Sequence, residues 1–244
     1  MDNQQRQQQI LNYLRQSHFA SIDEIAKNIY VSGATARRDL EKLKQKGYVK
    51  TVYGGVVLTE YSNEVVPISL RDRENAELKE KIAYEAAKLV KDNDTIILDS
   101  SSTARRICRH IKNRKNLTVI TNNLRICDEL KDSDIAVYCT GGSLARRHDC
   151  FTGHYAREFL RQISAVTVFF SSQGLLQNGN IVDNSEEDIA LRKIMLSRAK
   201  NKIFLCDSSK FGKDCPFTLC NASDITQIIS DKPWPVHSED ENNV

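Results

Sequence analysis

Apolar residues recur at helical spacing near the start of the chain, and this pattern predicts three helices. The first lies within residues 4–16. The second begins with Ser-Ile-Asp-Glu at 21–24, a capping box whose Ser and Glu side chains satisfy free amides at a helix start. The third begins at Ser32, and two short strands follow between residues 48 and 58, around a pair of glycines. This order of elements predicts a winged helix-turn-helix domain over residues 1–58.

The third predicted helix is apolar on one side only. Ala36, Leu40 and Leu43 fall together on a helical wheel, so they are expected in the core. The polar groups of its first turn then point outward, as those of a recognition helix do when they enter the major groove of DNA. Lys50 and Tyr53 stand at the rim of the predicted wing. The candidate DNA-binding residues are Ser32, Thr35, Arg37, Arg38, Lys50 and Tyr53. The alternative is a plain three-helix domain whose arginines are only solvated.

The rest of the chain alternates short apolar runs with helical segments. Residues 59–74 are polar and show no period, so a linker is predicted there. Helical spacing returns from residue 75, and six apolar runs follow near 95–98, 117–121, 135–139, 166–170, 202–206 and 225–229. Such runs between helices predict a Rossmann-like, mostly parallel α/β domain over residues 75–232, with both faces of its sheet covered. The polar segment 233–244 is expected to be a disordered tail.

Polar and glycine residues follow most of the predicted strands, and open parallel sheets bind ligands at the carboxyl ends of their strands. The hydroxyls of Ser100–Thr103 lie between a strand and a helix start, where free amides and the helix dipole favour a phosphate; the alternative is a helix cap without a ligand. Asp99 and Asp207 can accept hydrogen bonds from sugar hydroxyls, and Lys210 can neutralise a phosphate, although each also suits a purely local role. The candidate ligand-binding residues are Asp99, Ser100, Ser101, Ser102, Thr103, Thr121, Asn122, Gly141, Gly142, Gly174, Glu187, Asp207 and Lys210.

Charge and cysteine content narrow the range of partners. The first 58 residues hold nine Lys/Arg and five Asp/Glu, so this part alone accounts for the positive net charge and suits a phosphate backbone. Seven cysteines occur without a CxxC pair, which argues against zinc and, in a chain expected to be cytoplasmic, against a disulfide framework. Neither a nucleotide P-loop nor a dinucleotide motif is present, which favours a small phosphorylated metabolite over a cofactor. No apolar run approaches the roughly 18 residues that span a bilayer, so no membrane partner is expected.

Several segments carry more specific motifs: VSGATARRDLEKLKQKGYVKTVYGGVV at residues 31–57, and LDSSST, LTVITNN, SSQG and DSSKFG further along. They resemble the DNA-binding and sensor halves of the DeoR family of bacterial transcriptional regulators. The sensor half is similar in fold to ribose-5-phosphate isomerase and, in the family, senses a phosphorylated sugar or related metabolite. The resemblance implies ligand-loop positions at Asp99–Thr103, Asn122, Gly141, Gly142, Asp207 and Lys210. Departures at Ala36, Ser101–Thr103, Cys150 and Ser171–Ser172 bear on core packing and on the identity of the ligand.

The resemblance implies a DNA-binding transcriptional regulator, most often a repressor, whose affinity for double-stranded operator DNA changes when a phosphorylated sugar binds. A symmetric operator implies a homo-oligomer, a dimer or a tetramer. The competing interpretation is a sugar-phosphate isomerase fused to a DNA-binding head. Asp99, Glu187 and Lys210 have the chemical types that isomerisation needs, but their spacing does not show that they converge. Since a shared fold is weak support for a shared activity, a regulator without enzymatic activity is expected.

Overall fold

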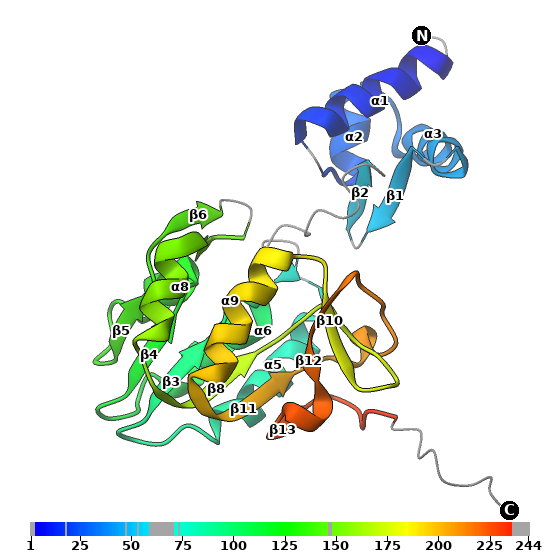
Figure 1. Ribbon diagram of the computed structural model, residues 1–244. Coiled ribbons are helices and arrows are strands. Elements are labelled where there is room, and N and C mark those ends of the chain that lie inside the picture. Colours follow the sequence, from blue (N-terminus) through cyan, green and yellow to red (C-terminus); the bar gives the residue numbers. More distant parts are fainter. Residues whose placement is uncertain are drawn as a thin grey trace, which may run out of the picture. The chain divides into compact units, whose positions relative to one another are not determined.

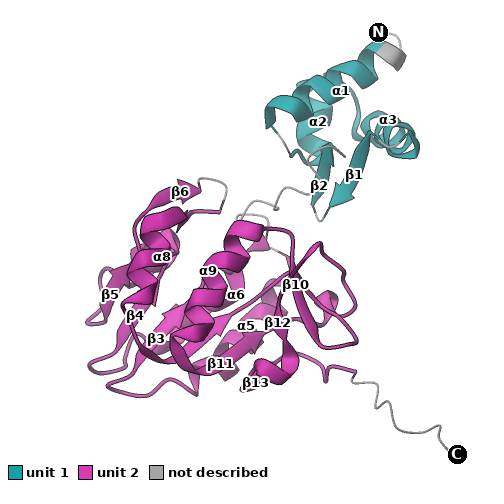
Figure 2. Ribbon diagram, in the orientation of Figure 1, with its two compact units in different colours: residues 1–65 teal, residues 66–244 magenta. Residues whose placement is uncertain are grey.

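The computed structural model describes residues 3–17, 19–46, 48–52, 54–58, 71–72, 74–145 and 148–235. The chain forms two compact units, residues 1–65 and 66–244, which Figure 2 colours separately. Tyr53, residues 59–70 of the expected linker and residues 236–244 of the expected tail lie outside the described residues. Within the described part of the chain, no helix has both the length and the apolar character that crossing a membrane requires.

Unit 1 is a winged helix-turn-helix, which confirms the fold predicted for this part. Its elements are α1 (Asn3–Ser17), α2 (Ile22–Asn28), α3 (Gly33–Gln45) and the antiparallel strands β1 (Val49–Val52) and β2 (Gly55–Leu58) (Figure 1). The capping box forms at the start of α2, and Ala36, Leu40 and Leu43 are buried. Position 55 has no room for a side chain, because β2 forms a β-bridge with the chain at Ala20. A Cβ on Gly55 would lie 2.3 Å from the Ala20 carbonyl oxygen.

Unit 2 is built on a six-stranded parallel sheet, which confirms the predicted Rossmann-like fold. Its strands are β3 (Thr95–Leu98), β4 (Thr118–Thr121), β5 (Ala136–Cys139), β8 (Ala165–Phe170), β11 (Ala199–Leu205) and β13 (Gln227–Ile229). Their order in the sheet is β13-β11-β8-β3-β4-β5, and every pairing is parallel. The chain moves outward from β3 to β5 and then returns to place β8 on the other side of β3. The direction of strand addition therefore reverses between β3 and β8, the position at which such sheets bind ligands.

Helices cover both faces of this sheet (Figure 1). One face packs against α5 (Ala76–Ala87), α6 (Ser102–Ile111) and α7 (Leu124–Leu130), and the other against α8 (Gly153–Arg161) and α9 (Glu186–Ser197). Successive residues of a strand enter different cores: Ile96 and Leu98 belong to the first, and Ile97 to the second. Because both faces are buried, the strands are continuous apolar runs, which is why the sequence predicts them.

Two small antiparallel sheets were not predicted. One has the order β12-β10-β9, with β9 (Gly174–Leu175), β10 (Asn180–Asp183) and β12 (Phe217–Asn221), and the other pairs β6 (Ser143–Ala145) with β7 (Cys150–Thr152). Two short 3-10 turns, η2 (Ser208–Lys210) and η3 (Ala222–Asp224), complete the elements. Each small sheet is formed by chain that leaves the carboxyl end of a strand of the large sheet. These segments therefore lie near the carboxyl ends of the strands of the large sheet.

Candidate functional site

The N-terminal half of α3 presents polar side chains to solvent. Arg37 and Arg38 are exposed, and so is Lys50 on β1. Ser32 caps the helix: its Oγ accepts a hydrogen bond from the Thr35 amide at 3.2 Å, and the two hydroxyl oxygens lie 2.9 Å apart. The two arginines are thus exposed donors in the second turn of α3, while Ser32 and Thr35 also serve to start the helix.

A buried ion pair holds α3 in place from the core side. Asp39 is 1% exposed, and its carboxylate accepts hydrogen bonds from Nε and Nη2 of Arg6 on α1. The signal for this pair in the sequence is a single acidic residue on the apolar side of the third predicted helix, next to Leu40. Because the pair ties α3 to α1, it helps to orient the exposed arginines.

Unit 2 contains a pocket at the carboxyl ends of β3, β8 and β11, where the strand order reverses. It encloses about 360 Å³ when its open mouth is included. Three of the expected residues, Ser101, Ser102 and Lys210, line it together. The full lining is Arg71, Glu74, Lys79, Ser101, Ser102, Ser171, Ser172, Gln173, Asp183, Arg192 and Lys210. The site therefore joins residues that are far apart in the sequence but follow neighbouring strands.

The start of α6 forms one wall of the pocket. Ser101 is the N-cap, and its Oγ accepts a hydrogen bond from the Ala104 amide at 3.1 Å. Asp99 fixes the approach to the helix, since its Oδ1 accepts from the Ser101 amide at 3.0 Å. Ser102 is the first helical residue and lies on the pocket wall. The positive end of the helix dipole is thus directed at the pocket, as it is in sites that bind anions.

A buried carboxylate–guanidinium cluster supports the floor of the pocket. Arg192 of α9 donates from Nε to Asp99 Oδ2 at 2.9 Å and from Nη1 to Asp183 Oδ2 at 2.7 Å. Ser172 donates its hydroxyl to the same Asp183 oxygen at 2.9 Å. Burial opposes the ionisation of Asp183, but the charge of Arg192 and the hydrogen bond from Ser172 outweigh it, and the pKa of this carboxyl lies below its ordinary value. Asp99 was expected to contact a sugar; in the structure it is fully buried and both its oxygens are engaged within the protein.

Two lysines add positive charge to the lining of the pocket. Lys210 donates from Nζ to the Ser171 hydroxyl at 2.7 Å. Lys79 of α5 is buried, and burial together with the charge of Lys210 lowers its pKa to about 8. Asp207 lies close to both: burial opposes its ionisation, but the charge of Lys210 and hydrogen bonds from Ser209 and Asn75 hold its pKa below the ordinary value. The pocket lining has four basic side chains and two acidic ones, of which Asp183 is already paired.

The remaining candidate residues of unit 2 do not line this pocket. Glu187 accepts hydrogen bonds from the Gly153 amide at 2.9 Å and from Arg157 at 2.7 Å, so it ties α9 to α8. Gly142, with φ +107°, and Gly174 sit where a Cβ would lie 2.4 Å and 1.9 Å from backbone carbonyl oxygens. The others lie at or near the ends of β3, β4 and β5, and all but Gly141 are buried: Ser100, Thr103, Thr121, Asn122 and Gly141.

Among the residues that the structure describes, one group has the residue types and the spacing of a metal site. It consists of His148, Cys150 and Asp188, whose possible ligand atoms lie within 4.8 Å of one another. Burial lowers the pKa of His148, and the charges of Arg71 and Arg192 lower it further. Burial likewise raises the pKa of the Cys150 thiol to about 12. The charges of Arg71 and Arg192 thus act against a further positive charge at His148, while Asp188 and Asp183 act in the opposite direction.

A helix-turn-helix with exposed arginines, joined in one chain to a separate unit with a ligand pocket, defines the class of ligand-responsive DNA-binding regulators. Residues 6–61 match the family model of the DeoR-like helix-turn-helix domain, and residues 74–232 match that of the DeoR C terminal sensor domain. The chain belongs to the DeoR family of transcriptional regulators.

Curated relatives align along nearly their whole length. GolR, an HTH-type transcriptional regulator of Listeria innocua, is 33% identical over 93% of this chain and 90% of its own. The transcriptional repressor GlcR of Bacillus subtilis is 31% identical, over 95% and 90%. The L-fucose operon activator of Haemophilus influenzae is 31% identical, over 94% and 92%. Since the relatives are regulators, the chain is a transcriptional regulator and not an enzyme, and the isomerase interpretation is not supported.

Solved structures match the chain more distantly. Ribose 5-phosphate isomerase from Plasmodium falciparum matches with a TM-score of 0.41 and 18% identity, over 55% of this chain and 52% of that one. The enzyme from Methanocaldococcus jannaschii matches with a TM-score of 0.43 and 22% identity, over 57% and 55%.

Proposed function

We propose that the chain is a cytoplasmic repressor of sugar-metabolism genes whose operator affinity is controlled by a phosphorylated sugar bound in the pocket of unit 2. The observation that carries the proposal is the convergence of Arg71, Lys79, Arg192 and Lys210 around the start of α6, at the switch point of the sheet. Cationic side chains, free amides and hydroxyls together are suited to a phosphoryl group. GlcR is a transcriptional repressor, and the relative from Haemophilus influenzae is an activator of the L-fucose operon; these relatives support control of transcription in this metabolic context.

Within the pocket, one set of groups binds the phosphoryl group and another binds the sugar. The phosphoryl group lies against the α6 start and Lys210, where the positive charge is concentrated. Glu74, Ser172 and Gln173 supply acceptors and donors for the hydroxyls of the sugar. The effector must bind the DNA-competent and DNA-incompetent states with different affinity, because only differential binding shifts an equilibrium.

At the DNA, Arg37 and Arg38 are proposed to read base edges or phosphates in the major groove, with Ser32 and Thr35 beside them. Lys50, and Tyr53 beyond the described residues, are proposed to contact the backbone or the minor groove at the wing. A homo-oligomer, a dimer or a tetramer, would place two such heads on a symmetric operator.

The test is a thermal-shift screen of the full chain against hexose and pentose phosphates, with the parent sugars and inorganic phosphate as controls. Unfolding of unit 2 is followed by Trp234, the one tryptophan of the chain, which packs against a core of that unit. A sugar phosphate that binds the folded state raises the melting temperature, and its parent sugar does not at the same concentration. Lys210→Gln should reduce this shift in melting temperature. Lys88→Gln should not, because Lys88 is an exposed lysine at the end of α5. Absence of any shift with the phosphates contradicts the proposal, as does an undiminished shift in Lys210→Gln.

A further inference from the structure

Arg71 lines the pocket although neither the helical periodicity nor the strand-end pattern of the sequence predicts it. It comes from the segment predicted to be linker, yet its side chain lines the pocket beside Lys79 and Arg192. Its Nε is buried and has no hydrogen-bond partner. Among the described residues, no Asp or Glu forms an ion pair with it. Burial lowers the pKa of this guanidinium, and the charges of Asp188 and Asp183 offset part of that effect.

A buried guanidinium without a direct counter-charge is costly, because its desolvation is not offset by a partner. An anion in the pocket would supply both the charge and an acceptor for Nε. Arg192, by contrast, already has two carboxylates, and Lys210 already donates to Ser171. Arg71 is therefore the cationic side chain of the pocket with the most to gain from a bound anion.

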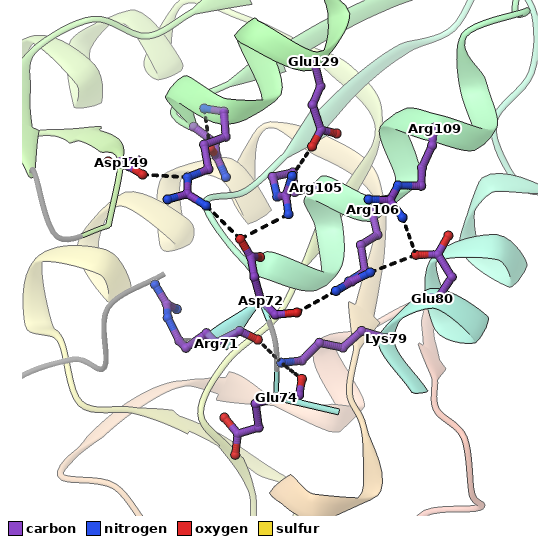
Figure 3. Close-up of polar contacts among 12 residues, drawn as sticks. Arg71, Asp72, Glu74, Lys79, Glu80, Arg105, Arg106, Arg109, Glu129 and Asp149 are labelled. Carbon is purple, nitrogen blue, oxygen red and sulfur yellow. Dashed lines mark hydrogen bonds and ion pairs between the residues drawn. The ribbon is translucent and has the colours of Figure 1, made fainter. Parts of the chain in front are cut away.

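The backbone around Arg71 is fixed by the pocket's own lysine. Lys79 Nζ donates to the carbonyl oxygen of Arg71 at 2.6 Å and to that of Glu74 at 2.7 Å. These two bonds hold the ends of the segment 71–74 against α5 (Figure 3). An anion that attracts Lys79 therefore acts on the same side chain that holds this segment in place.

Asp72, the neighbour of Arg71, is held by arginines of two helices. Its Oδ2 lies 3.1 Å from Arg105 Nη2 and 2.9 Å from Arg125 Nη1. Its carbonyl oxygen accepts from Arg106 Nη2 at 2.6 Å. These arginines are themselves paired with further carboxylates, including Glu80 at 3.0 Å from Arg106 (Figure 3). The segment is thereby attached to α6, the helix whose first turn forms the pocket wall.

We infer that Arg71 is an anion-binding residue of the effector site, so the stretch that joins the two units ends inside that site. This rests on the proposed function, since it assigns a further contact to the same pocket. Residues 71–74 follow directly on the segment 59–70, which leads in the sequence from the DNA-binding unit. Because Arg71 directly follows that segment, a ligand that contacts both Arg71 and the start of α6 acts at the point where the connection from the DNA-binding unit enters unit 2.

The test measures binding of inorganic phosphate and of glucose 6-phosphate to the full chain by isothermal titration. Arg71→Gln removes the charge at similar length and is expected to weaken the tighter of the two by about 10- to 100-fold, the range for a lost charge-assisted hydrogen bond. Arg71→Lys should recover part of the affinity. Arg109→Gln is the matched control, because Arg109 belongs to the same ion-pair network through Glu80 at 3.1 Å but is half-exposed and does not line the pocket. Far-UV circular dichroism and Trp234 fluorescence establish that each variant is folded.

Hydrogen exchange provides a second measurement. In the parent chain, saturating anion should slow exchange of the amides between Arg71 and Lys79, and in Arg71→Gln the same degree of saturation should leave them unprotected. Unchanged affinity and unchanged protection in Arg71→Gln overturn this inference, while the loss of binding in Lys210→Gln leaves the proposed function intact. If neither of these two anions nor any sugar phosphate of the thermal-shift screen binds the parent chain, the proposed function fails and this assignment fails with it.

Discussion

Substitution of Arg192 by methionine is expected to destabilise unit 2 by about 3 kcal/mol. The side chains of Arg192, Asp99 and Asp183 are 5%, 1% and 2% exposed, so solvent does not screen the cluster. Removing one partner of such a buried pair costs about 3–5 kcal/mol, because an uncompensated charge remains. The lower end applies here, since Ser101 and Ser171 amides still donate to Asp99 and the Ser172 hydroxyl to Asp183.

The assay is urea unfolding of the full chain, followed by Trp234 fluorescence so that only unit 2 is recorded. The pKa of Asp183 is lowered in the folded parent, so its contribution is present above its ordinary pKa and is lost as the pH falls through the folded value. The variant has no such contribution to lose, so the difference between the two proteins should persist from pH 7 to about pH 4 and narrow only as the pH falls further. Arg109→Met, which removes a half-exposed arginine, should cost about 0–1 kcal/mol. A loss in Arg192→Met as small as that of Arg109→Met would refute the reasoning.

Three further predictions concern the DNA head and the pocket. Arg37→Ala and Arg38→Ala should each weaken operator binding by about 1–3 kcal/mol in a gel-shift titration, whereas Lys44→Ala in the last turn of the same helix should have a smaller effect; equal effects of all three would indicate general charge attraction alone. Asp39→Asn should destabilise unit 1 by about 2 kcal/mol in thermal unfolding followed by circular dichroism, because a charge-assisted hydrogen-bonded pair is lost; an unchanged transition would contradict the role assigned to the pair. The pKa of Lys79 is about 8, and a bound anion raises it, so binding of a phosphate monoester near pH 8.5 should take up protons. This uptake appears in calorimetry as a binding heat that depends on the buffer. A heat that does not depend on the buffer would place the anion away from Lys79.

The fold of unit 1 was predictable because its signals are local. A capping box, a helical apolar face and a glycine pair each act within a few residues, and together they specify the order of elements. In unit 2 the strands were predictable for a similar reason, since burial on both faces makes them continuous apolar runs. The small sheets were not, because strands such as β9 and β10 are short and pair only when the large sheet brings them to one edge.

The pocket was predictable only where its residues follow a strand directly. Ser101, Ser102 and Lys210 were found in this way, and the structure brings them together. Arg71 and Arg192 were missed because which strands are neighbours is a property of the whole sheet, and no local pattern encodes it. Arg192 does leave a trace in the sequence, as Asp39 does in unit 1, because each is a charged residue on the buried side of a helix; on α9, Arg192 shares that side with Asp188. A buried ion pair is the physical explanation for such a charge.

The reversal of strand order between β3 and β8 also has a consequence for biosynthesis. The pocket takes residues from the end of β3, the first strand of the large sheet to be synthesised, and from the end of β11, the fifth of six. No emerging portion of the chain that stops short of β11 contains the site, so the ligand can bind only after almost all of unit 2 has been made. A metabolite that binds only the finished unit shifts the folding equilibrium towards it by mass action. The steady-state amount of the regulator would then rise with the metabolite it senses, independently of any change in transcription.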